Sequence, residues 1–304
     1  MRILSIGEIL WDVIHDREFL GGAPLNFSVA AHRLGNFVAL LSAVGLDRRG
    51  SSAIEAMARL GLSTDFVQTV CNMRTTGAAV VTTDKAGNAT FKIDRPAAFD
   101  AVELNDALIA RFSQLNLDWV YFGTLAHALD QGEQRLIRLL SALPAARCFY
   151  DVNLRDTHWS LALVQRLSKL ASIIKLNGTE AEVLFHLTFS SEPFSLERFC
   201  AYWSSTYDVD TICITLGADG CAVYNNDRLQ RFRGFSVVIA DTVGAGDAFA
   251  AGFLHAHGLG WTMESQAMFA NALGAIVASR RGATPPWTVD ECLQLCCMSA
   301  TDKV

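Results

Sequence analysis

The sequence has no apolar run long enough to cross a membrane, although apolar residues make up 51% of its 304 residues. A membrane-spanning helix needs about 20 consecutive apolar residues, so no membrane segment is expected. Positive charge is also scarce, because 25 lysines and arginines face 31 acidic residues and give a net charge of −6. This balance argues against a nucleic-acid-binding surface. It does not exclude an anionic nucleotide, which a local cradle of backbone amides can bind.

Paired cysteine motifs are absent as well. The eight cysteines are scattered, and no Cys-x-x-Cys pair occurs. Cys292 and Cys296 share one face of an expected terminal helix, but no histidine lies nearby to complete a metal site. The first residues, Met-Arg-Ile-Leu-Ser-Ile-Gly-Glu, predict a strand rather than a signal peptide. We therefore expect a cytoplasmic protein with reduced cysteines.

Strand-like apolar runs alternate with helix-like stretches along most of the chain. Strands are expected at 2–7, 38–44, 117–122, 147–152, 172–176 and 211–215. Helices are expected at 24–34, 51–60, 131–140, 161–170 and 179–185, followed by two long helices that end near Arg281. Repeated strand–helix units predict an α/β fold, with a mainly parallel central sheet and helices on both faces. We expect one such domain over residues 1–304.

One stretch breaks this alternation. Segments 76–83 and 89–93 are rich in β-branched residues and are joined by the turn-rich segment 84–88, which predicts a hairpin. Together with residues 11–22 this hairpin is expected to form a small β-sheet lid, which consists of about residues 11–22 and 74–97. The lid could close over a substrate, and it could also form a homodimer that protects its exposed edges.

The segment Asp-Thr-Val-Gly-Ala-Gly-Asp at 241–247 is the most specific motif in the chain. A Gly-Ala-Gly turn at a helix start can present free amides and partial positive charge to an anion. No lysine follows to complete a Walker loop, and Phe249 stands where a dinucleotide-binding fingerprint needs Gly or Ala. Asp247 could simply cap a helix, but beside an anion it is suited to accept a proton from an attacking hydroxyl.

Two further groups of polar residues precede expected helices. Asp12, Gly21, Gly22 and Asn26 offer a carboxylate, an amide and a close-approaching backbone, which suit a polyol; a tight turn is the alternative. At 175–180, Thr179 could cap the following helix. Alternatively, Asn177 and Glu180 could organise water around Mg²⁺ at the carboxyl end of the sheet.

Together these motifs resemble the signatures of the ribokinase-like (PfkB) sugar kinase family. The N-terminal signature is matched by 21–35 and the C-terminal one by 241–252, and the Asn-x-x-Glu element lies at 177–180. Segments 44–47, 215–220, 270–271 and 281–283 follow in the expected order. The resemblance therefore covers nearly the whole chain.

The resemblance implies a role for each matching residue. Asp247 would be the catalytic base, and Gly244, Ala245 and Gly246 would supply amides to the γ-phosphoryl group of ATP. Other implied nucleotide-side residues are Asn177, Thr215, Gly217, Gly220 and Asn271, with Glu180 acting on Mg²⁺ through water. Asp241 matches a position that helps to bind a monovalent cation such as K⁺. Val243 stands where the family often has Thr or Ser, so a backbone carbonyl would have to serve as ligand at that position.

The substrate that the resemblance implies is a small ketose, with fructose as the first choice, which would yield fructose 6-phosphate. Fructokinases resemble this chain at Gly-Gly-Ala-Pro-x-Asn, at 122–126 and at Asp-Val-Asn-Leu-Arg, where Asn153 and Arg155 stand. Arg95, which leaves the hairpin, is expected to face the sugar. The rival substrate 2-keto-3-deoxygluconate carries a carboxylate that Arg95 or Arg155 could bind. Ribose, a nucleoside and a non-catalytic regulator that binds sugar or nucleotide are the remaining alternatives.

Overall fold

The computed structural model describes residues 1–301 except 15–16, 72–73, 84–88, 130 and 156; it describes no side chains for 14, 81–91 and 298–301. The turn expected at 84–88 therefore lies outside the described residues. None of the helices in the described ranges combines the length and the apolar character that spanning a bilayer requires.

The central sheet has the strand order β13-β12-β11-β10-β9-β8-β1-β4-β5 in the described part of the chain. All neighbouring strands run parallel up to β11, beyond which β12 and β13 continue the sheet with antiparallel pairing. The strands are β1 (Arg2–Ile6), β4 (Phe37–Gly45), β5 (Val67–Val70), β8 (Trp119–Gly123), β9 (Arg147–Asp151), β10 (Ile173–Asn177), β11 (Thr211–Thr215), β12 (Cys221–Asn225) and β13 (Arg228–Phe232).

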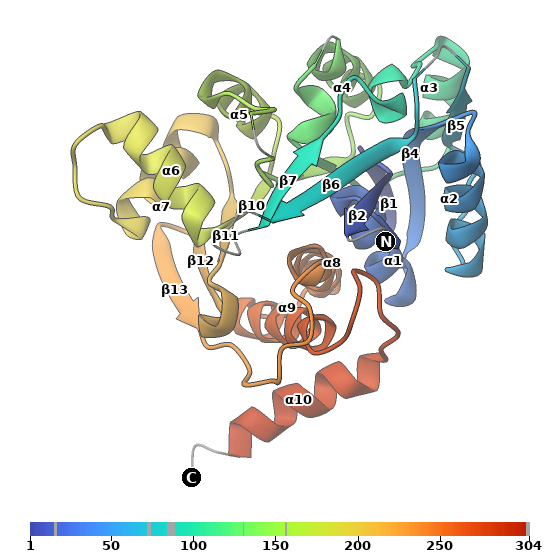
Figure 1. Ribbon diagram of the computed structural model, residues 1–304. Helices are drawn as coiled ribbons and strands as arrows, with labels where there is room; N and C mark the ends of the chain where they lie inside the picture. Colours follow the sequence, from blue (N-terminus) through green and yellow to red (C-terminus); the bar gives the residue numbers. More distant parts are fainter. Residues whose placement is uncertain (15–16, 72–73, 84–88, 130, 156, 302–304) are drawn as a thin grey trace.

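Helices cover both faces of this sheet (Figure 1). One face packs against α3 (Asp106–Ser113), α4 (Gly132–Ser141), α5 (Leu161–Ser168), α6 (Gly178–Phe189) and α7 (Leu196–Tyr207). The other face packs against α1 (Ala23–Arg33), α8 (Ala245–Gly258) and α9 (Met263–Ala278), with α10 (Val289–Thr301) behind α9. Helix α2 (Arg48–Arg59) covers the edge near β4.

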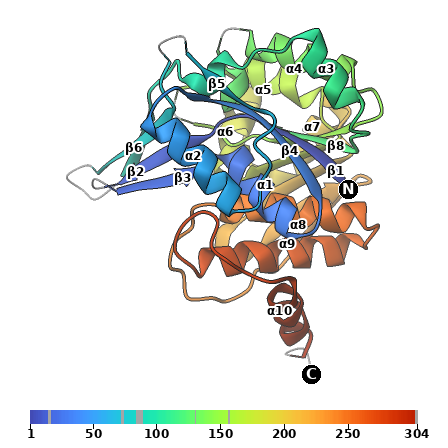
Figure 2. The same ribbon diagram turned by 90° about the vertical axis from the view of Figure 1, so that its right-hand side faces the viewer.

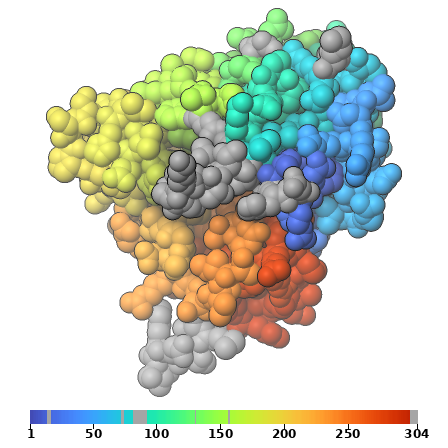
Figure 3. Space-filling model, viewed as in Figure 1, coloured from blue at the N-terminus to red at the C-terminus, as the bar shows by residue number. Residues whose placement is uncertain are grey.

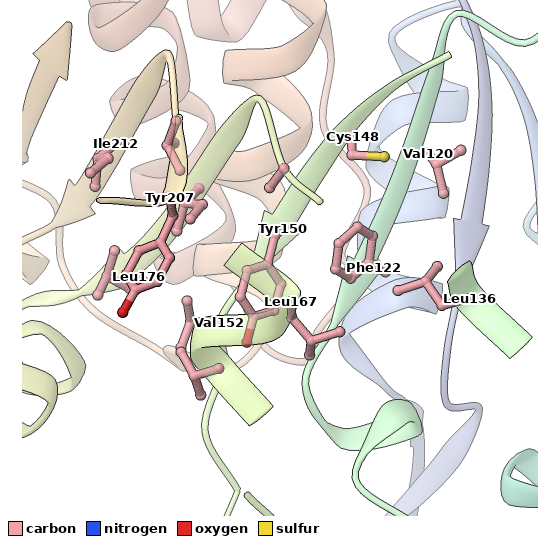
Figure 4. Packing of buried hydrophobic residues seen from close by; sticks show 14 of the residues in the cluster. Val120, Phe122, Leu136, Cys148, Tyr150, Val152, Leu167, Leu176, Tyr207 and Ile212 are labelled. Atoms are coloured by element: carbon pink, nitrogen blue, oxygen red, sulfur yellow. The ribbon is translucent and has the colours of Figure 1, made fainter. Parts of the chain in front are cut away.

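The two faces of the central strands are both apolar, as expected for a parallel sheet that is buried on both sides. Val120 and Phe122 of β8 join the cluster under α3 to α7, whereas Trp119 and Tyr121 join the cluster under α8 and α9. Figure 4 shows Phe122 beside Tyr150 of β9, and their rings stack with centroids 5.2 Å apart. The predicted α/β class and the helices on both faces are confirmed.

A second, four-stranded sheet lies at one edge (Figure 2). Its strand order is β3-β2-β6-β7, from β2 (Leu10–Ile14), β3 (Arg17–Gly21), β6 (Gly77–Thr83) and β7 (Ala89–Ile93). The hairpin predicted between 76 and 93 is β6 and β7, and the segment expected to complete the sheet is β2 and β3. Asp12 and Gly21 therefore belong to this small sheet.

Candidate active site

The glycine turn at 241–247 forms the start of α8. Gly244 has φ +80°, and a Cβ there would lie 2.2 Å from the carbonyl oxygen of Ala283, so only glycine fits without moving backbone. The Asp241 carboxylate accepts the N–H groups of Val243 at 3.0 Å and Gly282 at 3.1 Å. These two hydrogen bonds fix the turn against the segment after α9. Both oxygens of the Asp241 carboxylate, which was predicted to help bind a monovalent cation, thus accept backbone amides in this structure.

Asp247 lies in the first turn of α8 and is 8% exposed. Its Oδ2 accepts the Asn26 Nδ2–H at 2.8 Å. Burial raises the pKa of Asp247 to about 6; the nearby Asp151 also raises it, whereas Lys175, Asn26 and Arg155 lower it. Such a carboxylate is ionised at neutral pH yet basic enough to accept a proton from a hydroxyl.

Four residues predicted to bind the sugar converge beside Asp247. A Cβ on Gly21 would lie 2.6 Å from the Asp12 Oδ2 atom, so this carboxylate of the small sheet approaches the glycine closely. Gly22 precedes α1 with φ +112°, a conformation in which other residues are strained. The Asn26 Oδ1 atom is buried and has no hydrogen-bond partner in the described ranges. A buried acceptor without a partner is suited to a ligand hydroxyl.

Glu8 is a site residue that sequence reasoning missed. It is 3% exposed, and its Oε1 accepts the Ala23 N–H at 3.2 Å, which fastens the start of α1 to the end of β1. Burial raises the pKa of Glu8 to about 7; Arg155 lowers it and Asp247 raises it. The available signal was an acidic residue two positions after the buried strand β1.

Glu8→Gln is expected to make the protein less sensitive to high pH. Because its folded pKa lies above the ordinary value of 4.5, Glu8 contributes stability at low pH that is lost as the pH rises through about 7. The substitution removes this loss. The free energy of unfolding of the variant, relative to that of the parent, should rise by on the order of 2 kcal/mol between pH 5 and pH 8.5. Urea unfolding at both pH values measures this difference.

Glu55→Gln serves as the matched control, because Glu55 lies on α2 with a side chain that is 70% exposed. Its free energy of unfolding should follow that of the parent at both pH values. If the Glu8→Gln variant also follows the parent, Glu8 does not titrate in the folded state as described.

Arg155 is an exposed cation among the residues predicted to bind the sugar. It interacts electrostatically with three carboxylates, those of Glu8, Asp12 and Asp247. Burial raises the pKa of Asp12 to about 6, although Arg155 lowers it. Asn153 is half-buried and has φ +40°, which turns the chain between β9 and Arg155. The predicted residues Asn153 and Arg155 thus follow a strand end that faces the other sugar-side residues.

The expectation that Arg95 faces the sugar is wrong for this structure. Its side chain is 1% exposed, and its guanidinium forms an ion pair with the equally buried Asp100. The guanidinium carbon also lies 5.4 Å from the centre of the Phe99 ring. Asp100 additionally accepts the Ala97 N–H at 2.9 Å. A buried arginine needs such a partner, so Arg95 holds the turn after β7 rather than offering a charge to a ligand.

A cleft runs along the carboxyl ends of β10 and β11. Two cavities of about 870 and 670 Å³ border it, and both contact Asn177, Thr215 and Gly217. The smaller cavity also contacts the remaining predicted nucleotide residues, Gly220 and Asn271, and the turn residues Ala245 and Gly246. On the face seen in Figure 3, the yellow surface of α6 and α7 lies above the orange surface of the segment after β13. The cleft therefore joins the residues predicted to bind the nucleotide to the glycine turn.

Asn177 and Glu180 form a reciprocal cap at the start of α6. The Asn177 Oδ1 accepts the Glu180 N–H at 2.8 Å, and the Glu180 Oε2 accepts the Asn177 N–H at 2.8 Å. The helix cap is thus Asn177 rather than Thr179. Glu180 also accepts the Leu154 N–H through Oε1, and burial raises its pKa. Its role toward Mg²⁺ stays a prediction, because both carboxylate oxygens hold backbone amides here.

The described residues include no group of three or more His, Cys, Asp or Glu side chains that could hold a metal ion. A nucleotide-bound Mg²⁺ needs no such group, because it keeps several waters and takes its other ligands from the phosphates. The cleft beside Gly246 suits a phosphate chain, because it contacts the first turn of α8, where a helix N-terminus favours an anion and Gly246 has no side chain to cover the backbone. In this structure the Ala245 N–H donates to the Thr242 carbonyl oxygen at 3.3 Å.

Comparisons with known proteins agree with this arrangement. A fructokinase from Vibrio alginolyticus is 28% identical over 301 residues, covering 93% of this chain and 94% of that protein. A ribokinase from Haemophilus influenzae is also 28% identical, covering 86% of this chain and 82% of that protein. The crystal structure of a fructokinase with bound ATP from Xylella fastidiosa superposes with a TM-score of 0.86 at 24% identity, over 98% of this chain and 99% of that chain.

The structural likeness establishes the fold, and the relatives carry the names of more than one sugar kinase. The sequence profile described as pfkB family carbohydrate kinase matches residues 5–290, which is nearly the whole chain. The protein therefore belongs to the pfkB family of carbohydrate kinases.

Proposed function

We propose that the protein transfers the γ-phosphoryl group of ATP to the primary hydroxyl of a small neutral ketose, and that fructose is converted to fructose 6-phosphate. The observation that carries the proposal is the position of Asp247. Its carboxylate is hydrogen-bonded to Asn26 on the sugar side, while Gly246, the residue before it, borders the nucleotide-side cleft.

In the proposed reaction, Asp247 accepts the proton of the attacking hydroxyl. The new bond joins the sugar oxygen to the γ-phosphorus, and the bond to the β–γ bridging oxygen breaks, so that ADP leaves. The amides of Gly244, Ala245 and Gly246 and the α8 dipole stabilise the negative charge on the transferred group. Mg²⁺ bound to the nucleotide would neutralise phosphate charge. Asn177, Thr215 and Gly217 would border those phosphates.

The charges on the sugar side favour a neutral substrate. Glu8, Asp12 and Asp247 supply three carboxylates. Arg155 interacts with all three, and Lys175, which also acts on Asp247, is paired with Asp151. Arg95 is already paired with Asp100. An acidic or phosphorylated sugar would meet repulsion from the carboxylates, so fructose is preferred to 2-keto-3-deoxygluconate. The fructokinase name of the Vibrio alginolyticus relative supports the same choice.

The small sheet is proposed to act as the lid of this site. Asp12 of β2 carries one of the sugar-side carboxylates, so movement of the sheet would bring it toward or away from the sugar. Closure would exclude water, which otherwise competes as phosphoryl acceptor. The outer strands β3 and β7 would be covered in the proposed homodimer.

A panel of acceptors tests the proposal. Release of ADP from ATP and Mg²⁺ would be measured with fructose, 2-keto-3-deoxygluconate, ribose and adenosine side by side. Fructose should give the highest kcat/KM. Faster turnover of 2-keto-3-deoxygluconate would replace fructose in the proposal, and no turnover with any acceptor would favour the non-catalytic regulator. The intact turn at 241–247 argues against that regulator, which needs no base at the transfer point.

Activity is expected to fall below about pH 6. Asp247 must be deprotonated to accept a proton, and its pKa is raised to about 6. Below that value kcat/KM should fall about ten-fold for each pH unit, because only the ionised fraction is active. A pH profile between 4.5 and 8 in buffers of constant ionic strength measures this. An acid limb centred near pH 4, the ordinary pKa of an aspartate, would show that the site does not raise the pKa of Asp247.

A further inference from the structure

Three neighbouring strands carry one buried polar side chain each on the sheet face that packs against α8. These residues are Tyr121 of β8, Asp151 of β9 and Lys175 of β10. Most side chains of this layer are apolar, for example Phe27, Phe149 and Ile173. A polar row inside an apolar layer needs a physical explanation, because burial of charge is costly.

Asp151 is the centre of the row. The Lys175 Nζ donates to both Asp151 carboxylate oxygens, each at 3.0 Å, and the Tyr121 hydroxyl donates to Oδ2 at 3.0 Å. The side chain of Asp151 is 0% exposed and that of Lys175 is 8% exposed. Buried ion pairs often contribute little net stability, so this one is not explained by folding alone.

Lys175 lies directly beneath the glycine turn. A Cβ on Gly246 would lie 3.1 Å from the Lys175 Nζ atom. A positive charge at a helix N-terminus opposes the helix dipole, which makes this position unfavourable unless a carboxylate accompanies it. Burial alone would lower the pKa of Lys175, but Asp151, Glu180 and Asp247 outweigh burial and raise it. The ammonium therefore stays protonated under the turn.

We propose that Lys175 is a positioning residue for phosphoryl transfer: clamped by Asp151, its ammonium supports the Gly244–Gly246 turn and directs positive charge toward Asp247 and the transferred group. This role rests on the proposed function. It differs from general-base catalysis by Asp247, because Lys175 acts through the base and the turn. It also explains why these polar side chains are buried in a layer that is mostly apolar.

The two charges of the pair act on Asp247 in opposite directions. Asp151 raises the pKa of Asp247, and Lys175 lowers it. Removal of the Asp151 charge should therefore move the acid limb of the pH profile to lower pH. Removal of the Lys175 charge should move it to higher pH. The other polar groups that act on Asp247 from neighbouring elements are Glu8, Asp12, Asn26, Tyr121 and Arg155.

The experiment compares Asp151→Asn with the double variant Asp151→Asn/Lys175→Met. Position 151 is neutral in both, so the comparison isolates the Lys175 charge. The acid limb of kcat/KM should move to lower pH in Asp151→Asn. It should lie about one pH unit or more higher in the double variant than in Asp151→Asn. The plateau kcat should be about ten-fold lower in the double variant, with the sugar KM within about two-fold.

Cys213→Ala is the matched control. Cys213 is buried in the same layer and is the residue of β11 that is paired with Lys175. The control should keep the acid limb of the parent. If Asp151→Asn prevents folding, Lys175→Met and Lys175→Arg in the parent chain make the comparison. Arg should then preserve the acid limb and the plateau kcat, whereas Met should change both.

A readout without turnover separates this proposal from the proposed function. The Asp247 carboxyl carbon, labelled with ¹³C and assigned by its loss in Asp247→Asn, can be titrated by NMR in each variant. The Asp247 pKa should be higher in the double variant than in Asp151→Asn even if no sugar is phosphorylated. Coincident NMR titrations in the two variants would overturn the role of Lys175, whatever the activity of the parent.

Discussion

Replacement of Asp247 by Asn is expected to reduce kcat by a factor of about 10² to 10⁴. Asn is nearly the same size and can still accept the hydrogen bond from Asn26, but it cannot take a proton from the sugar hydroxyl. The pKa of Asp247 is raised to about 6, so at neutral pH the folded protein bears the cost of a buried ionised carboxylate. The variant should therefore lose activity without losing stability, and steady-state kinetics with thermal unfolding measures both.

Asp219→Asn is the control for this substitution. Asp219 is an exposed carboxylate that lines the nucleotide-side cleft at η3 (Gly217–Asp219). Its substitution should change kcat by less than about three-fold, because it removes one surface charge and no proton acceptor. More than about a tenth of parental activity remaining in Asp247→Asn would be incompatible with general-base catalysis of the expected size.

Gly244→Ala is expected to impair both folding and catalysis. A Cβ at this position would lie 2.2 Å from the Ala283 carbonyl oxygen, and φ is +80°. The backbone must therefore shift, at an expected cost of about 2–4 kcal/mol in the free energy of unfolding. A shifted turn misplaces the amides that face the transferred group, so kcat should fall by about 10²-fold. Urea unfolding and kinetics of the purified variant test the two effects.

Gly260→Ala separates backbone strain from the specific contact at Gly244. Gly260 also has positive φ, at +70°, but a Cβ there would meet no other side chain or backbone atom within 4 Å. It follows α8 on the side away from the glycine turn. Its substitution should cost about 1 kcal/mol and leave kcat unchanged. Equal losses in the two variants would mean that the contact with Ala283 does not matter.

The interior of the fold could be predicted from the sequence, whereas several outer elements could not. Strands such as β8 and β11 are buried on both faces and read as continuous apolar runs. Strands β5 and β13 are edge strands with half-exposed, mixed residues, and neither was predicted. The buried strand β12 was missed as well. Helix α7 was also missed, although Ser195 caps it. Its stability comes from the packing of Phe199 and Trp203 in the core, which no local pattern shows.

The site shows the same division between local and long-range information. The turn at 241–247 can be recognised from its own sequence, because Gly244 needs positive φ and α8 starts after it. The row of Tyr121, Asp151 and Lys175 depends on the register of three strands, so only the folded chain brings it together. Arg95 was assigned to the sugar because it leaves the hairpin. Its partner Asp100 lies in a buried turn that the sequence did not predict.

The proposed phosphorylation of fructose is tested most directly by the ³¹P NMR spectrum of the product that the parent protein forms from fructose, ATP and Mg²⁺. One new sugar phosphate, fructose 6-phosphate, is expected to form in equal amount to ADP. The same incubation with Asp247→Asn should give almost none over the same time. A product phosphorylated at another carbon, or the absence of any sugar phosphate at neutral pH, would contradict the proposed conversion of fructose to fructose 6-phosphate.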